Sequence, residues 1–120
     1  MSNLTLGSNF ILDTDCTTTE KKTGATWIDG KPIYRKVITT TSPSSTSAVT
    51  YNLGITNPDT VINVIVMIDS RITSPFYATS TNLSYWYLES NRTQMGFTVK
   101  DSSWFSKPVH IIIEYTKTTD

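Results

Sequence analysis

Residues able to carry catalytic chemistry are sparse in this chain. His110 is the only histidine and Cys16 is the only cysteine. A serine or cysteine nucleophile needs a base within hydrogen-bond reach, so such a site would have to use His110, which stands between Val109 and Ile111. No serine lies in a Gly-x-Ser-x-Gly context. The sequence therefore predicts a protein that is not an enzyme, with His110 on a sheet surface or at a subunit contact.

Metal and cofactor sites lack the residues they need. Asp13 and Asp15 have a spacing seen in calcium loops, but the glycine and the distal glutamate of an EF-hand do not follow. One histidine and one cysteine cannot build a zinc site. The five glycines are scattered, which leaves no glycine-rich loop for phosphate. We expect no metal and no cofactor.

Aromatic side chains are the strongest candidates for a contact surface. They gather at Tyr85, Trp86 and Tyr87, and again at Trp104 and Phe105. An aromatic face stacks on the C–H groups of a sugar ring, while neighbouring amides and hydroxyls bond its edge. The favoured interpretation is plainer, because rings of this kind dominate protein cores and subunit contacts. We take these five residues as candidates for ligand or subunit contact.

Short strands separated by turns have to position these rings. Residues 61–68 are apolar on both faces and rich in β-branched side chains, which favours a central strand over a buried helix. Residues 83–88 and 94–100 form a predicted hairpin, and no segment keeps a helical period for three turns. The prediction is an all-β fold, an antiparallel β-sandwich of about seven or eight strands. Further strands are expected at residues 33–40, 48–53, 76–78 and 109–115.

Composition fits a single β domain with a neutral surface. The 120 residues include 22 Thr, which favours strands, and 14 Ser, which favours turns. Ten basic residues balance ten acidic ones without a basic block, so nucleic acid is not an expected partner. The start of the chain shows no signal segment, and no apolar run has the length of a membrane helix. We expect synthesis in the cytoplasm and no membrane contact.

The first residues differ from the rest of the chain. Residues 1–23 are mostly polar and are predicted to form an N-terminal arm, followed by the sandwich domain at residues 24–120. Phe10, Ile11 and Leu12 are the apolar cluster of that arm. Two interpretations remain open: a first strand on the domain's own sheet, which is favoured, or a plug that anchors the chain on a neighbouring protein.

Residues 27–36 combine a turn with the start of a strand. They read Trp-Ile-Asp-Gly-Lys-Pro-Ile-Tyr-Arg-Lys, with Asp29-Gly30 as the turn and alternating side chains from Ile33 onward. Arg35 and Lys36 fall on opposite faces, where charge sits at a rim or discourages pairing between sheet edges. This stretch, together with the ending Ile-Glu-Tyr-Thr-Lys-Thr-Thr-Asp at residues 113–120, resembles a module of bacteriophage virion proteins.

The resemblance implies a function that composition does not. Proteins with this module include head fibres, tail fibres and baseplate components, so the chain is expected to be a non-enzymatic virion structural protein. It would be made in the host cytoplasm and contact other virion proteins. The alternative is a carbohydrate-binding domain for host attachment that contacts surface glycans. An apolar patch that includes Ile112 is expected to make the chain a homo-oligomer. The choice of a homotrimer follows from the resemblance to phage fibres.

Overall fold

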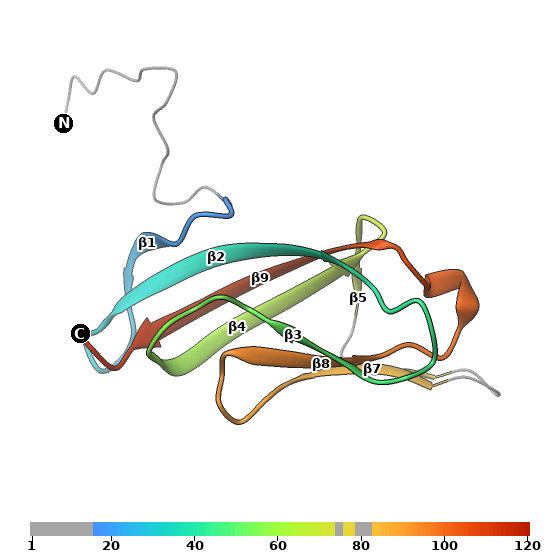
Figure 1. Ribbon diagram of the computed structural model, residues 1–120. Helices are drawn as coiled ribbons and strands as arrows, with labels where there is room; N and C mark the ends of the chain where they lie inside the picture. Colours follow the sequence, from blue (N-terminus) through green and yellow to red (C-terminus); the bar gives the residue numbers. More distant parts are fainter. Residues whose placement is uncertain (1–15, 74–75, 79–82) are drawn as a thin grey trace, which may run out of the picture.

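The computed structural model describes residues 16–73, 76–78 and 83–120, which form two antiparallel sheets packed face to face (Figure 1). One sheet has five strands in the order β1-β2-β9-β4-β5, and the other has four in the order β3-β8-β7-β6. The predicted all-β sandwich is confirmed. The strands are β1 (Lys21–Thr26), β2 (Pro32–Thr41), β3 (Val49–Asn52), β4 (Pro58–Ile68), β5 (Arg71–Thr73), β6 (Phe76–Ala78), β7 (Leu83–Leu88), β8 (Gln94–Thr98) and β9 (Pro108–Lys117).

The turn before β2 forms as the sequence predicts. Gly30 has a φ of +86°, and its N–H donates to the carbonyl of Trp27 at 2.9 Å. The Asp29 carboxylate accepts from the N–H of Lys31 at 3.0 Å, which closes the turn on the other side. Because glycine adopts a positive φ without steric cost, the chain reverses here and β1 pairs antiparallel with β2. Ile28, at the tip of the turn, is 90% exposed.

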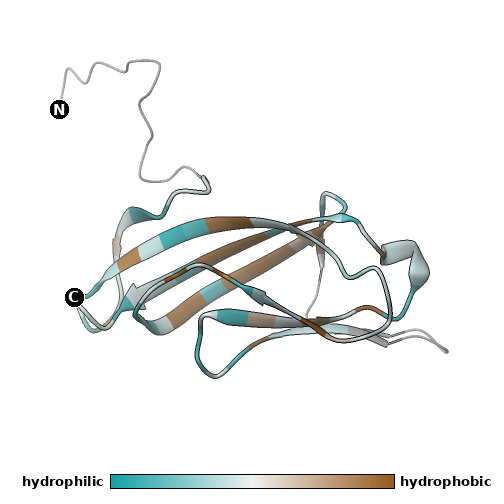
Figure 2. Ribbon diagram, in the orientation of Figure 1, coloured by the Kyte–Doolittle hydropathy of each residue, from teal (hydrophilic) through white to brown (hydrophobic). Residues whose placement is uncertain are grey.

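Strand β9 is the centre of the five-stranded sheet, with β2 on one side and β4 on the other. Val109, Ile111, Ile113 and Tyr115 point inward from it and are fully buried, as the alternation predicts. Figure 2 shows hydrophobic bands along β2, β4 and β9. Burying side chains of this size contributes about 1.5–3 kcal/mol each, so this central strand anchors the core.

The four-stranded sheet closes the core from the other side. Met95 and Phe97 point inward from β8 and are almost completely buried. Leu53 follows β3 and is 1% exposed, and the chain then turns at Gly54, where φ is +66°. The hairpin of β7 and β8 is confirmed, with Trp86 opposite Phe97 and Leu88 opposite Met95. The core therefore lies between the two sheets.

Two strands were not expected from the sequence. β1 begins at Lys21, so the expected boundary between arm and domain at residue 23 falls inside a strand. β5 pairs with the end of β4 through a two-residue turn in which Asp69 and Ser70 both have positive φ. The interpretation of Arg35 at a rim or edge is wrong, because β2 has a neighbour on both sides. The predicted anchor at Phe10, Ile11 and Leu12 lies outside the described residues.

Candidate functional site

The five candidate aromatic residues lie in two different places. Strand alternation puts Tyr85 and Tyr87 on the outer face of the four-stranded sheet, where they are 37% and 46% exposed. Trp86 points to the opposite face of the sheet and packs against the core. Trp104 also packs against the core, from the loop before β9. Phe105 is half-buried and follows the short 3₁₀ helix η1 (Ser102–Trp104). The five candidates therefore do not form one continuous platform: Tyr85 and Tyr87 are an outer pair, Trp86 and Trp104 are an inner pair, and Phe105 belongs to neither.

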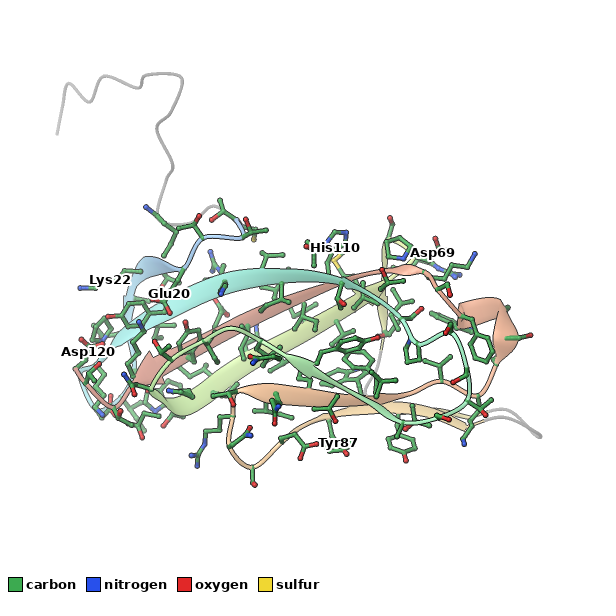
Figure 3. All side chains as sticks on the ribbon, in the orientation of Figure 1. Glu20, Lys22, Asp69, Tyr87, His110 and Asp120 are labelled. Carbon is green, nitrogen blue, oxygen red and sulfur yellow. The ribbon has the colours of Figure 1, made fainter. Side chains whose placement is uncertain are left out.

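The outer pair is a stacked pair of tyrosines. The ring centroids of Tyr85 and Tyr87 are 6.3 Å apart and the ring planes differ by 25°. Their cross-strand partners on β8 are Thr98 and Gly96. Both partners are buried, because the tyrosine rings cover this part of β8. Figure 3 shows Tyr87 pointing away from the sandwich. The result is a small aromatic platform open to a partner.

Charge near the platform keeps the Tyr87 phenol neutral. The negative charge of Glu89, together with partial burial and a hydrogen bond to the same carboxylate, raises the pKa of Tyr87 above its usual value. A neutral phenol both donates and accepts hydrogen bonds. The platform can therefore stack on an apolar surface and bond a hydroxyl at its edge, which is the chemistry that a sugar requires.

The inner pair lines a cavity at the end of the sandwich that holds η1. The cavity has a volume of about 300 Å³ and lies between the end of the β4–β5 hairpin and the β7–β8 hairpin. Ile68, Trp86, Phe97, Val99 and Trp104 supply most of its apolar wall. The lining also includes Arg71, Ile72, Thr73, Tyr85 and Thr98. Sequence analysis found the two tryptophans but not the cavity they share.

One cation stands beside this cavity. The Arg71 guanidinium lies 5.1 Å from the centroid of the Trp104 ring, a cation–π contact. Its other partner is Asp69, whose carboxylate oxygen is 3.8 Å away. Both charged side chains are largely exposed, at 65% for Arg71 and 47% for Asp69, so solvent screens this pair. The stacking on Trp104 therefore holds the guanidinium in place while leaving its N–H groups open to an anion.

Two buried polar atoms belong to residues that line the cavity. Neither Nε1 of Trp86 nor Oγ1 of Thr98 has a hydrogen-bond partner within the part of the chain that the structure describes. A buried donor without a partner costs about 1–3 kcal/mol, which makes such atoms rare in native folds. Thr98 is opposite Tyr85 and so lies on the outer side of the sheet, whereas Trp86 is opposite Phe97 on the inner side. The indole N–H of Trp86 without a partner marks the inner wall as a candidate site for a ligand.

Hydrogen bonds around η1 hold Trp104 at the cavity. Asp101 caps η1 by accepting hydrogen bonds from the N–H and the hydroxyl of Ser103, at 3.0 and 2.8 Å. The hydrogen bonds from the backbone and side chain of Ser103 also hold the pKa of Asp101 below its usual value. Ser42 donates to the Trp104 carbonyl at 2.7 Å and accepts from the Lys107 N–H at 2.8 Å. These bonds tie both sides of the loop to the end of β2.

The outer face of the five-stranded sheet is a second candidate surface. Val37, Ile112 and Ile65 form one row across β2, β9 and β4. Each of the three is only half-buried, which confirms that apolar partners of the last strand reach the surface. Met67, the next outward residue of β4, pairs with the 74% exposed Ile72 of β5, and these two residues add apolar surface in the neighbouring row. We call these five residues the outer apolar face.

Polar groups border the outer apolar face at one end. The Arg35 guanidinium binds Glu114 across the strands at 2.7 and 3.0 Å, and the Asn63 amide binds the same carboxylate at 3.0 Å. Burial alone would raise the pKa of Glu114, but the bonds from Asn63 and Arg35 and the charge of Arg35 outweigh it and lower the pKa. This cluster is therefore charged at neutral pH and marks the limit of the apolar surface.

The residues considered for catalysis lie apart from these surfaces or at their margin. His110 is half-buried on the outer face, between Thr39 and Met67 on the neighbouring strands (Figure 3). Cys16 is exposed. Among the described residues, no three His, Cys, Asp or Glu side chains are grouped so as to hold a metal ion. Asp13 and Asp15 are outside that part of the chain.

Comparisons with known proteins identify no relative of the chain. No protein-family model, curated protein or solved structure matches the chain. Within the described ranges, the structure contains no helix with the length and apolarity needed to cross a membrane.

Proposed function

We propose that the chain is a non-enzymatic structural subunit of a bacteriophage particle, a small fibre or decoration subunit of the head, tail or baseplate. The observation that carries this proposal is the pairing of the two stretches that resemble phage proteins. Tyr34 is opposite Tyr115 and Arg35 is opposite Glu114 on the neighbouring strands β2 and β9. Sequences far apart in the chain thus form one structural unit, as expected if a module keeps both of them.

Side-chain contacts support the same unit. The Tyr34 hydroxyl donates to Asp120 at 2.8 Å, and the Lys117 ammonium lies 4.5 Å from the centroid of the Tyr34 ring. Lys31, in the opening stretch, forms an ion pair of 2.7 Å with Asp59 at the start of β4. The opening and closing stretches therefore build one end of the sandwich together, on the side where the C terminus lies (Figure 1).

Particle association is tested directly by locating the protein. Electron microscopy of virions that carry a labelled copy is expected to show the label at one defined position, and purified particles are expected to contain the chain. Absence from purified particles would contradict the proposal. A variant without residues 2–15 tests the anchor separately, because it keeps Glu20 and the whole of β1. Loss of that variant from particles, with its fold intact, is the expected result.

The proposed working unit is a homotrimer that buries the outer apolar face. Val37, Ile65 and Ile112 lie on the three interior strands of the sheet, and no described element covers them. Apolar surface of this kind is stabilised by burial, and closed symmetry buries the same patch on every subunit. Zero net charge adds no long-range repulsion between copies. The number three comes from the resemblance to phage fibres.

Mass measurement tests this assembly. Light scattering should give about three times the chain mass of 13.4 kDa. Ile112→Lys places a charge in the centre of the outer apolar face and should yield a folded monomer by circular dichroism. Ile28→Lys places the same charge at the 90% exposed tip of a turn and should leave the mass unchanged. A wild-type protein that stays monomeric at micromolar concentration would exclude the trimer.

A second candidate function is glycan recognition, favoured by the stacked pair of Tyr85 and Tyr87. Binding on a glycan array that is lost in Tyr87→Ala and kept in Phe105→Ala would support it, because Tyr87 lies in strand β7 and Phe105 lies in the loop after η1. Retention of binding in Tyr87→Ala would rule out this platform. Both variants should still assemble, so the two functions can be separated.

A further inference from the structure

We propose that the cavity between the two sheets binds a small amphipathic anion, an aromatic apolar body that carries one carboxylate. This inference is independent of the proposed role in the virion. It rests on three features of the cavity: the apolar wall, the cation beside it and the indole N–H of Trp86, which has no partner among the described residues.

The wall selects an apolar body. Trp86, Phe97 and Trp104 present aromatic rings, and Ile68 and Val99 fill the space between them. A volume of about 300 Å³ lies at the low end of the range for ligand pockets, so the body has to be small. A sugar carries hydroxyls around its whole perimeter, and an apolar wall leaves most of them without partners. A flat aromatic ring, in contrast, stacks on the same wall without that cost.

Arg71 favours a ligand that carries a negative charge. Its guanidinium is held over the Trp104 ring at 5.1 Å, and the loose contact with Asp69 at 3.8 Å leaves donors available. A planar guanidinium binds a carboxylate through two parallel hydrogen bonds, which are stronger and more directional than neutral ones. An apolar body inside the cavity can therefore place its carboxylate at Arg71, near the exposed Ile72.

The indole N–H of Trp86, which has no partner among the described residues, explains why an occupant stabilises this end of the fold. The indole N–H of Trp86 is only a donor, and it has no acceptor among the described residues. The Thr98 hydroxyl also lacks a partner, but Thr98 lies on the outer side of the sheet with Tyr85 and takes no part in this wall. The π face of a bound aromatic ring can accept weakly from this indole N–H after a small rotation of the Trp86 side chain. Binding should thus be reported by the Trp86 indole proton itself.

The probe that tests this proposal is 1-naphthaleneacetate, with neutral 1-naphthaleneacetamide as its matched partner. In a titration of ¹⁵N-labelled full-length protein, the acid should shift the Trp86 and Trp104 indole resonances saturably and leave Trp27 unchanged. The amide should bind at least about tenfold more weakly, because it lacks the charge that Arg71 recognises. Absence of a saturable shift with the acid, or a shift centred on Trp27, would overturn the proposal.

Three variants test the contribution of Arg71, of a distant cation and of the cavity volume to binding. Arg71→Gln should reduce the affinity for the acid to that of the amide, whereas Lys22→Gln, an exposed cation on β1 at the other end of the sandwich, should not (Figure 3). Thr73→Phe fills the cavity and should abolish binding of both probes. Equal binding of the acid to wild type and Arg71→Gln would refute the anion site, even with Thr73→Phe misfolded. None of these measurements depends on particle association, so each proposal can fail alone.

Discussion

Tyr87 covers Gly96 across the β7–β8 hairpin. A Cβ atom built on Gly96 would lie 2.5 Å from Cζ of the Tyr87 ring and 2.7 Å from its hydroxyl oxygen. A Cβ atom essentially never lies within 3.0 Å of a heavy atom to which it is not bonded, so glycine is required at position 96 while the ring stays in place. The arrangement resembles the cover that aromatic residues give to glycines in other sheets, where the ring replaces the missing side chain. It also fixes the orientation of the tyrosine platform.

Gly96→Ala should therefore move Tyr87 rather than unfold the protein. The clashing atoms are at the far end of a side chain that is 46% exposed, so the ring can swing outward. We expect a loss of stability below about 1 kcal/mol and a loss of the stacking between Tyr85 and Tyr87. Urea denaturation measures the first effect, and changes in the tyrosine ring resonances measure the second.

A double variant provides the control. In a Tyr87→Ala background the ring is gone, and Gly96→Ala should then cost nothing or even stabilise the strand, because glycine is a poor strand former. Equal costs in the two backgrounds would show that the ring does not constrain position 96. Any glycan binding at the platform should fall in Gly96→Ala as it does in Tyr87→Ala.

The second prediction concerns Glu20, the residue just before β1. Its carboxylate accepts from the hydroxyl of the fully buried Tyr115 and pairs with the Lys117 ammonium at 2.6 Å. Glu20→Ala leaves both groups without this acceptor and should cost about 1–3 kcal/mol. Tyr115→Phe removes one hydroxyl and should cost about 1 kcal/mol. Unfolding of the two variants in urea compares these costs.

The double variant of Glu20 and Tyr115 should be less destabilised than the sum of the single ones, because the two residues share one hydrogen bond. Additive costs would mean that Glu20 acts through Lys117 alone. Lys22→Ala, which removes an exposed side chain from the same segment, should change stability by less than about 0.5 kcal/mol and serves as the reference.

Alternation along each strand was enough to predict most of the fold. Ile111, Ile113 and Tyr115 are buried as their period of two requires, and Ile112 reaches the outer face. The β7–β8 hairpin follows from the same pattern in residues 83–100. These predictions succeed because side-chain direction in a strand depends only on position along the chain. Sheet order needs contacts between distant strands, so the sequence did not show it.

The missed hairpin has a specific cause. Asp69 and Ser70 both adopt positive φ, with values of 55° and 62°, as a two-residue hairpin turn of the I′ type requires. Asn-Gly or Asp-Gly is the usual sequence for such a turn, and neither residue here is glycine. Without that signal, β5 was not predicted. Arg71 and the cavity beside it went unnoticed for the same reason, since β5 brings them together.

The aromatic site was predicted in part. Alternation correctly separates Trp86 from Tyr85 and Tyr87, but it does not show that Trp86 and Trp104 line one cavity. Trp104 joins Trp86 only because the loop with η1 folds back over the end of the core. Nothing local in the sequence specifies that contact, which depends on Ser42 bonding to both sides of the loop.

The third prediction is a stabilising substitution. Thr98 is 4% exposed and its hydroxyl has no partner within the described ranges. Thr98→Val keeps the shape, removes the buried hydroxyl and should stabilise the fold by about 1 kcal/mol. Thr116→Val is the matched control: Thr116 is also buried, but its hydroxyl accepts from the Thr60 N–H at 3.1 Å. That variant should lose about 1 kcal/mol. If the two substitutions change the midpoint of thermal unfolding equally, the hydroxyls of Thr98 and Thr116 do not differ in hydrogen bonding as described.

Acid should weaken the fold through Glu114. Its pKa in the folded protein is lower than the ordinary value of 4.5, so the folded state favours the charged carboxylate. The resulting stability is fully present above pH 4.5 and is lost as the pH falls through the lower folded pKa. Glu114→Gln and Arg35→Gln should each flatten this acid dependence in urea denaturation, whereas Lys22→Gln should not. If both variants lose stability at acid pH as steeply as the wild type, Glu114 is not the source of this pH dependence.

Alkaline pH should weaken the fold through Tyr115. Burial is the main cause that raises the pKa of Tyr115 far above its ordinary value of 10.0, and the bond to Glu20 and the charge of that carboxylate add to it. The folded state therefore keeps the phenol proton at a pH where the unfolded chain releases it. The associated stability is present below pH 10.0 and is lost as the pH rises toward the higher folded pKa.

Tyr115→Phe isolates this contribution to alkaline unfolding. The phenol of one buried tyrosine changes the slope of stability by up to about 1.4 kcal/mol per pH unit, and the variant should lack that part of the slope above pH 10. Tyr85→Phe, at an exposed position, should keep the wild-type slope. Urea denaturation of the three proteins between pH 8 and 11 makes the comparison. If Tyr115→Phe and wild type lose stability in parallel, Tyr115 ionises in the folded state as readily as in the unfolded chain, and its bond to Glu20 does not retain the proton.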